Sequence, residues 1–90
     1  MVAPWYVYIV KCADDTLYTG STTNVKARLV AHNSLRAGAR YTRARQPVTL
    51  VYESQWPDRT LAAKEEWRIK QLTRSAKLAL WHSYRDRLHD

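Results

Sequence analysis

Six side chains have the types and the spacing that acid–base and phosphate chemistry require. A phenol or an imidazole can transfer a proton, a guanidinium can hold a phosphate oxygen, and a carboxylate can hold a divalent cation. Hydrolysis of a phosphodiester needs a base for water, a cation beside the developing charge, and a group that neutralises the leaving oxygen. The candidates for these tasks are Tyr8, Tyr18, Arg28, His32, Glu65 and Glu66.

Other common reaction classes find no support in the sequence. One cysteine and three scattered histidines lack the spacing of a zinc site. Two glycines are too few for a phosphate-binding loop, and no serine lies in a nucleophile elbow. Each candidate also has a purely structural interpretation, because strand tyrosines usually belong to the core and glutamate pairs usually face solvent.

The elements that position these side chains follow from the hydrophobic pattern. Residues 5–10 are apolar on both alternating faces, which predicts a central strand. A second strand over residues 16–21 forms a hairpin with it. An odd-numbered or bulged connection puts Tyr8 and Tyr18 on the same face, whereas a plain two-residue turn puts them on opposite faces. The remaining predicted elements are a helix over 24–35, a strand over 48–53, a helix over 59–73 and a last helix from residue 75.

This order, β-β-α-β-α-α, predicts an α+β fold with a three-stranded, mostly antiparallel sheet, the first strand central and the helices flanking it. Arg28 and His32 fall inside the apolar stripe of the helix over 24–35. The strand over 48–53 alternates, with Tyr52 on one face and Val51 on the other. On the last helix, Leu80, Tyr84 and Leu88 are spaced to pack inward.

Helix caps and one glycine complete the local predictions. Thr23 or Asn24 would cap the first helix, Asp58 the second and Ser75 the third. Gly20, two residues after Tyr18, is expected to let the backbone turn sharply where a large substrate approaches.

Positive charge is concentrated in the middle of the chain. The formal net charge is +7, and there is no acidic residue between Asp15 and Glu53. Arginine offers planar donors to phosphate oxygens, so this segment predicts binding of a polyanion, with an affinity that falls steeply with salt. The predicted phosphate contacts, besides Arg28, are Lys26, Arg36, Arg40, Arg43 and Arg45.

Length and composition predict a single domain over residues 1–90, with its core at roughly 4–80. The longest apolar run, residues 5–10, is far shorter than the ~20 residues of a membrane-spanning helix. No secretory signal pattern is recognisable, and the lone Cys12 fits a reducing compartment. We therefore expect a cytoplasmic protein with no membrane contact.

Four segments match one known pattern in order and spacing. Tyr6-Val7-Tyr8, Tyr18-Thr19-Gly20, Asn24 to His32 and Leu61 to Lys70 together resemble the GIY-YIG nuclease domain, and more narrowly its small single-domain bacterial members. Three features depart from the pattern, one of them the lack of a recognisable counterpart of the asparagine that some relatives carry downstream of the glutamate. Tyr6 stands at the first glycine of the motif's name, and Ser21 stands where some relatives carry a lysine.

The resemblance implies divalent-metal-dependent cleavage of phosphodiesters, with Mg²⁺ or Mn²⁺ as the cofactor. It selects Glu66 as the metal-binding residue, whereas helical periodicity alone does not choose between Glu65 and Glu66. A single carboxylate, with waters and substrate oxygens, suits either ion. The implied catalytic residues are Tyr8, Tyr18, Arg28, His32 and Glu66. We expect these five side chains to line one concavity at the edge of the sheet.

The implied function is that of a DNA endonuclease, directed by the structure of its substrate rather than by sequence. Two alternatives stay open: a nucleic-acid-binding module without catalysis, and a subunit of a larger repair or processing complex whose protein partner supplies specificity. The choice between DNA and RNA, the oligomeric state and the identity of the general base also stay open.

Overall fold

The computed structural model describes residues 3–34 and 44–88. Its elements follow the predicted order β-β-α-β-α-α, so the predicted α+β class is confirmed. They are β1 (Trp5–Lys11), β2 (Leu17–Thr22), α1 (Val25–His32), β3 (Thr49–Trp56), α3 (Arg59–Lys70) and α4 (Arg74–Leu88).

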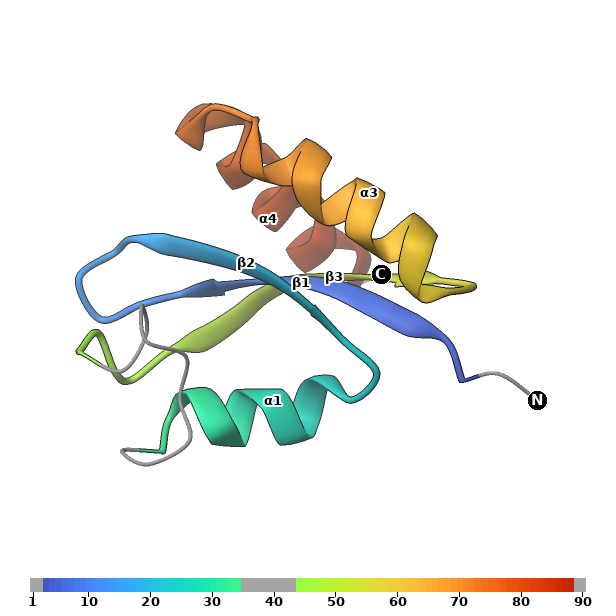
Figure 1. The fold of residues 1–90 in the computed structure, drawn as a ribbon. Helices are drawn as coiled ribbons and strands as arrows, with labels where there is room; N and C mark the ends of the chain where they lie inside the picture. The colour runs from blue at the N-terminus through green and yellow to red at the C-terminus, as the bar shows by residue number, and fades with distance from the viewer. Residues whose placement is uncertain (1–2, 35–43, 89–90) are drawn as a thin grey trace.

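β1 is the central strand of the sheet, as its pattern predicts. The strand order is β2-β1-β3, and both pairings are antiparallel. Helices α3 and α4 cover one face of the sheet and α1 lies against the other (Figure 1). Val7 and Ile9 pack towards α3 and α4, whereas Tyr8 and Val10 pack with Leu29 of α1. Because β1 is covered on both sides, it is apolar on both of its faces.

The hairpin connection fixes the directions of the two tyrosines. Lys11 pairs with Leu17, which leaves the five residues 12–16 between the strands. Asp15 has a φ of 67°, and this left-handed residue completes the reversal. In this register Tyr8 lies opposite Gly20 and Val10 opposite Tyr18. Tyr8 and Tyr18 therefore share one face of the sheet, as an odd-numbered connection predicts.

A bulge in β3 changes the alternation that the sequence predicts. Ile9 pairs with Tyr52 but Val10 pairs with Leu50, so Val51 is the extra residue. Val51 and Tyr52 consequently join the same core cluster, on the side of α3 and α4. The prediction that they point to opposite faces was wrong, because one inserted residue shifts every later side chain to the other face.

The helix starts follow the predicted caps in two of three cases. Asn24 Oδ1 accepts from Ala27 N at 3.0 Å, and Asp58 Oδ1 accepts from Leu61 N at 2.9 Å. At α4, however, Thr73 Oγ1 accepts from Ala76 N at 3.2 Å, so Ser75 lies inside the helix. Leu80 and Tyr84 of α4 pack against the core as predicted, whereas Leu88 is 65% exposed, which contradicts its predicted inward packing.

In the part of the chain that the structure describes, no helix combines the length and apolar character that crossing a bilayer requires.

Candidate nuclease active site

A buried tyrosine and histidine form the centre of the site. The Tyr8 hydroxyl on β1 lies 2.8 Å from Nε2 of His32 at the end of α1, and both side chains are almost inaccessible to solvent. The tautomer of the imidazole decides which of the two groups donates. The His32 ring also makes edge contacts with Tyr8 and Tyr18, with ring centroids 5.8 and 5.2 Å apart. His32 thus fixes both rings from behind.

Position 20 must be a glycine, because the Tyr8 ring occupies the space that a side chain would fill. A Cβ at this position would lie 2.5 Å from the Tyr8 hydroxyl and 2.7 Å from its Cζ, distances that no real contact tolerates. Gly20 is an ordinary member of β2 without a positive φ. The predicted sharp turn was therefore wrong. The glycine is needed because Tyr8 crosses directly over it.

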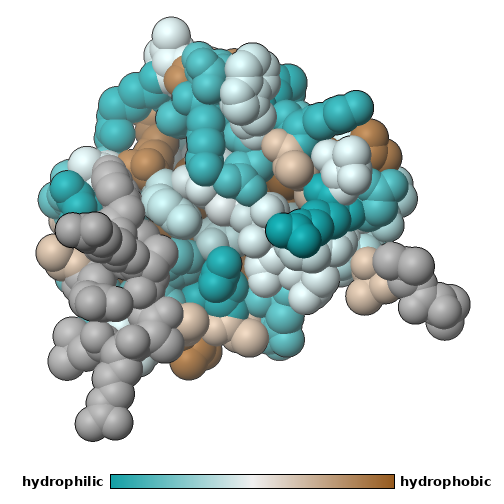
Figure 2. All heavy atoms as spheres, viewed as in Figure 1, coloured by the Kyte–Doolittle hydropathy of each residue, from teal (hydrophilic) through white to brown (hydrophobic). Residues whose placement is uncertain are grey.

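Four of the six candidate side chains meet in a cleft of about 290 Å³ at the β2 edge of the sheet. Tyr8, Tyr18 and Gly20 approach from the face covered by α1, and Ser21 from the opposite face, because it pairs with Val7. Figure 2 views the molecule from this side and shows mostly hydrophilic side chains with small, scattered apolar groups. The cleft is lined by Trp5, Tyr8, Tyr18, Gly20, Ser21, Arg28, Arg59 and Glu66.

Four of the five predicted catalytic residues line this cleft, and His32 does not. His32 is 1% exposed and reaches the cleft only through its contacts with the two tyrosines. The expectation that all five side chains share one surface is therefore wrong for His32. Its place in the apolar stripe of α1 puts it beneath the sheet. The catalytic roles of the five residues stay predictions.

The structure shows which of the two adjacent glutamates lines the cleft, a choice that helical periodicity alone does not make. Glu66 lines the cleft, where its Oε1 accepts from Ser21 Oγ at 2.7 Å and its Oε2 accepts from Lys70 Nζ at 2.6 Å. Glu65 forms a two-pronged ion pair with Arg68 at 2.6 and 2.7 Å and is not part of the cleft wall. Only Glu66 can therefore meet a ligand in the cleft.

A divalent cation fits this donor set as a partly hydrated ion. In residues 3–34 and 44–88, no three histidine, cysteine or acidic side chains gather into a protein cage for a metal. Glu66 offers one carboxylate that faces an open cleft and is already oriented by Ser21. Mg²⁺ and Mn²⁺ accept this arrangement, because water and substrate phosphate oxygens complete their coordination.

Burial and charge set the proton affinities at the centre. Burial raises the pKa of Tyr8 to about 12, although a hydrogen bond from Arg28 and its positive charge act in the opposite direction. Burial, and then the charge of Arg28, lower the pKa of His32 below its ordinary 6.5. At neutral pH the site therefore holds a protonated phenol beside a neutral imidazole.

We expect acid to destabilise the fold through His32. Its pKa is lower in the folded chain than in the unfolded one, so the unfolded chain takes up the proton first as the pH falls. The free energy of unfolding should thus be highest above about pH 6.5 and decrease as the pH falls through the folded-state pKa. Denaturant melts between about pH 7.5 and about pH 5 measure this slope, which His32→Asn should flatten. An unchanged slope in the variant would contradict the assignment.

Two arginines from different helices enter the cleft. Arg28 is exposed on α1 and contacts the Tyr8 hydroxyl. Arg59, the first residue of α3, lies with its guanidinium 5.6 Å from the centroid of the Trp5 ring. Sequence reasoning missed Arg59, yet it precedes Glu66 by seven residues, and this spacing places both on the same side of a helix.

The predicted phosphate-binding residues are dispersed where the structure describes them. Arg45 Nε donates to Asp14 Oδ2 at 3.0 Å, so part of its charge is neutralised by the hairpin. Lys26 lines a separate hollow that also contains Glu53. Arg36, Arg40 and Arg43 lie outside the described residues. Binding of nucleic acid by these five residues stays a prediction.

Comparison with known proteins identifies the family. The GIY-YIG catalytic domain matches residues 4–79, nearly the whole chain. This chain belongs to the GIY-YIG family. The match includes the strands and helices that supply every wall of the cleft, from Trp5 to Glu66.

Similar chains of about this size occur in several bacteria. The UPF0213 protein of Desulfotalea psychrophila is 57% identical over 76 residues, which are 84% of this chain and 69% of that protein. The UPF0213 protein of Staphylococcus haemolyticus is 48% identical over 79 residues, 88% of this chain and 95% of that one. The solution NMR structure of a UPF0213 protein from Bacillus halodurans has a TM-score of 0.54 at 42% identity, covering 86% of this chain and 81% of that chain. The GIY-YIG domain of this chain thus has the fold of these small proteins.

Proposed function

We propose that the cleft hydrolyses phosphodiester bonds in nucleic acid, most directly DNA, with the help of a divalent cation. The observation that carries this proposal is the convergence of Tyr8, Arg28 and Glu66, from β1, α1 and α3, on one cleft at a sheet edge. A phenol can transfer a proton, a guanidinium can oppose the developing charge, and a carboxylate can hold a divalent cation, which are tasks that phosphodiester hydrolysis requires. The chain belongs to the GIY-YIG family, whose matching domain is described as catalytic, and this membership supports the same proposal.

The arginines bind the phosphate and oppose its developing charge. Arg28 and Arg59 approach the cleft from opposite faces of the sheet, so a phosphate between them meets donors on two sides. A guanidinium that is already in place needs little reorganisation as charge builds on the phosphate oxygens. The cation–π contact with Trp5 restrains Arg59 in this direction.

Tyr8 and His32 move the proton. With its pKa raised to about 12, the Tyr8 phenol cannot serve as a ready-made phenolate near neutral pH. The neutral His32 imidazole, 2.8 Å away, can take the phenol's proton as the hydroxyl accepts one from the attacking water. The pair then acts as a relay, with Tyr8 at the cleft and His32 behind it.

Glu66 would hold the cation, and Ser21 and Lys70 fix the direction of its carboxylate. A bound Mg²⁺ or Mn²⁺ would supply positive charge for the phosphate and the leaving oxygen. Ser21 replaces the lysine of some relatives, so the nearby ammonium here comes from Lys70 on α3.

Tyr8→Phe should reduce the cleavage rate by about 10²-fold, because it removes the proton acceptor and leaves His32 Nε2 without its partner. Single-turnover rates near neutral pH measure the loss. Tyr52→Phe is the matched control, since Tyr52 is also a buried strand tyrosine but packs on the face of α3 and α4. Equal cleavage rates for Tyr8→Phe and the wild type would show that Tyr8 and His32 do not transfer the proton as proposed.

One observation favours a second candidate function, binding of nucleic acid without cleavage. Lys70 Nζ already contacts Glu66 Oε2 at 2.6 Å, so an ammonium neutralises the carboxylate to which a divalent cation would bind. In that case the two arginines hold a phosphate and nothing is hydrolysed. Divalent ions would then leave the nucleic acid intact.

The deciding experiment incubates the purified protein with end-labelled single-stranded, duplex and branched DNA in Mg²⁺, Mn²⁺ or EDTA. The proposal predicts discrete products with the metal ions and none in EDTA, with branched DNA as the preferred substrate. Binding of all three DNAs without any product in either metal would replace hydrolysis by the binding function.

A further inference from the structure

A large aromatic side chain lies exposed on the outer side of α3. Trp67 is 68% accessible to solvent. Among the described residues, the other large hydrophobic side chains exposed in this way are aliphatic: Val30, Leu61 and Leu88. Trp67 contributes little to the core, where α3 instead places Ala62 and Ile69.

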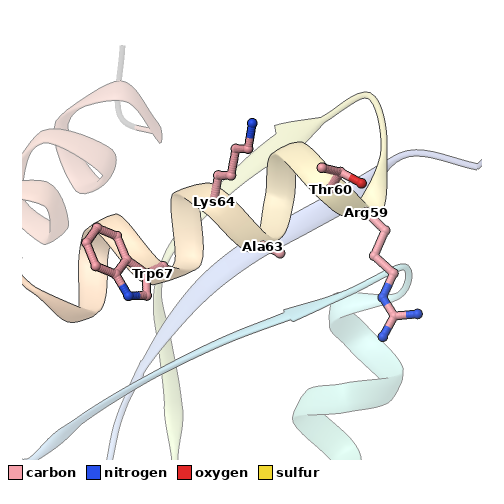
Figure 3. A pocket seen from close by; sticks show the side chains of 5 residues that line it. All are labelled: Arg59, Thr60, Ala63, Lys64 and Trp67. Atoms are coloured by element: carbon pink, nitrogen blue, oxygen red, sulfur yellow. The ribbon is translucent and has the colours of Figure 1, made fainter.

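Trp67 lies at one end of a shallow hollow with positively charged neighbours (Figure 3). The hollow measures about 460 Å³ and also contains Arg59, Thr60, Ala63 and Lys64. Arg59, Ala63 and Trp67 follow one another at four-residue intervals and therefore share a side of the helix.

The acidic residues of α3 do not offset this charge. Glu65 is occupied by Arg68, and its side chain is only 10% exposed. Glu66 points into the cleft, where Ser21 and Lys70 bind its two oxygens. The outer side of α3 thus presents an aromatic ring and two cations.

The hollow and the cleft have Arg59 in common. Arg59 lines both, and its side chain extends from the start of α3 towards β2 and α1 (Figure 3). Eight residues separate Arg59 from Trp67, about 12 Å along a helix. That length corresponds to about three nucleotide steps at the 3.4 Å spacing of a stacked strand.

We propose that the Trp67 surface, formed by Arg59, Thr60, Ala63, Lys64 and Trp67, binds an unpaired strand of nucleic acid that leaves the cleft. An unpaired base stacks on the indole, while Arg59 and Lys64 contact the phosphates on either side. This path of the strand, from the cleft to the Trp67 surface, rests on the proposed function, in which the cleft holds the phosphate to be cut. Paired bases in a duplex cannot offer a face to Trp67, so the surface distinguishes single-stranded from double-stranded segments.

Charge favours this occupant over a second copy of the chain. A twofold dimer through this surface would bring two identical patches together, each carrying Arg59 and Lys64, and like charges oppose such contact. A nucleic acid neutralises both cations, and the chain's net charge of +7 attracts it to the surface.

The test measures binding of fluorescent oligothymidylate and of a matched duplex by anisotropy, with EDTA present so that nothing is cut. Trp67→Ala should raise the dissociation constant for oligothymidylate about tenfold and leave that for the duplex within about twofold. Trp67→Tyr keeps an aromatic face and should restore most of the affinity. Leu88→Ala, at an equally exposed position on α4, is the control and should change neither constant.

Three results would overturn the proposal. Trp67→Ala could bind oligothymidylate as the wild type does, it could lose single strand and duplex equally, or it could convert a dimer to a monomer in sedimentation without changing DNA affinity. Because binding is measured without metal, the result is independent of cleavage. If Trp67→Ala selectively lost single-strand binding while the wild type cut no DNA, only the proposed hydrolysis would be wrong. If the wild type cut DNA and Trp67→Ala bound single strands normally, only the proposal for the Trp67 surface would be wrong.

Discussion

Arg28→Ala should lower the metal-dependent cleavage rate by about 10²- to 10³-fold while DNA affinity falls only a fewfold. The guanidinium enters the cleft beside Tyr8, where charge develops during the reaction, and a positioned donor stabilises that charge more than it stabilises the bound substrate. Ground-state affinity, in contrast, is shared among many cations of a chain with a net charge of +7.

Single-turnover cleavage and equilibrium binding of the same labelled DNA separate the two effects. Arg85→Ala is a suitable control, because Arg85 is exposed on α4, which packs on β3 at the opposite edge of the sheet from the cleft. If Arg28→Ala reduced binding and cleavage by the same factor, Arg28 would only hold the substrate.

Glu66→Gln should cause a loss of similar size, about 10²- to 10³-fold in rate. Glutamine keeps the shape and can still accept from Ser21, but it has no charge to hold a divalent cation. Glu65→Gln is a closely matched control, since it removes the same charge from the adjacent residue, whose carboxylate pairs with Arg68 away from the cleft.

The measurement compares cleavage rates at increasing Mn²⁺ for the two glutamate variants. Glu65→Gln should follow the wild-type curve, and Glu66→Gln should stay low at every concentration. A reversal of these two results would mean that the catalytic carboxylate is Glu65.

Some features of the site could be predicted because they depend on local periodicity. The hairpin itself could be predicted, but whether Tyr8 and Tyr18 share a face depends on the number of residues in its connection, which the sequence left open and the structure gives as five. The central position of β1 follows from its two apolar faces. Capping side chains likewise mark the starts of α1 and α3.

Other features depend on how elements pack, and no local pattern contains them. Glu66 meets the cleft because α3 crosses β2 so that Ser21 lies beneath it, a contact across 45 residues. The bulge at Val51 is set by pairing with β1, and the depth of His32 is set by the fit of α1 beneath the sheet. Arg59 lies seven residues before Glu66 on the same side of α3, but its contact with Trp5, 54 residues away along the chain, depends on how α3 packs against the sheet.

The most direct test of the account is a double-mutant cycle on the cleavage rate with Arg28→Ala, Glu66→Gln and the two combined. These residues come from opposite faces of the sheet, and the account holds that they act together on one phosphate. Groups that act as a unit give losses that do not multiply, so the double variant should be within about threefold of the slower single variant. Losses that multiply fully, or a wild type that yields no metal-dependent product, would contradict a single catalytic centre at the edge of β2.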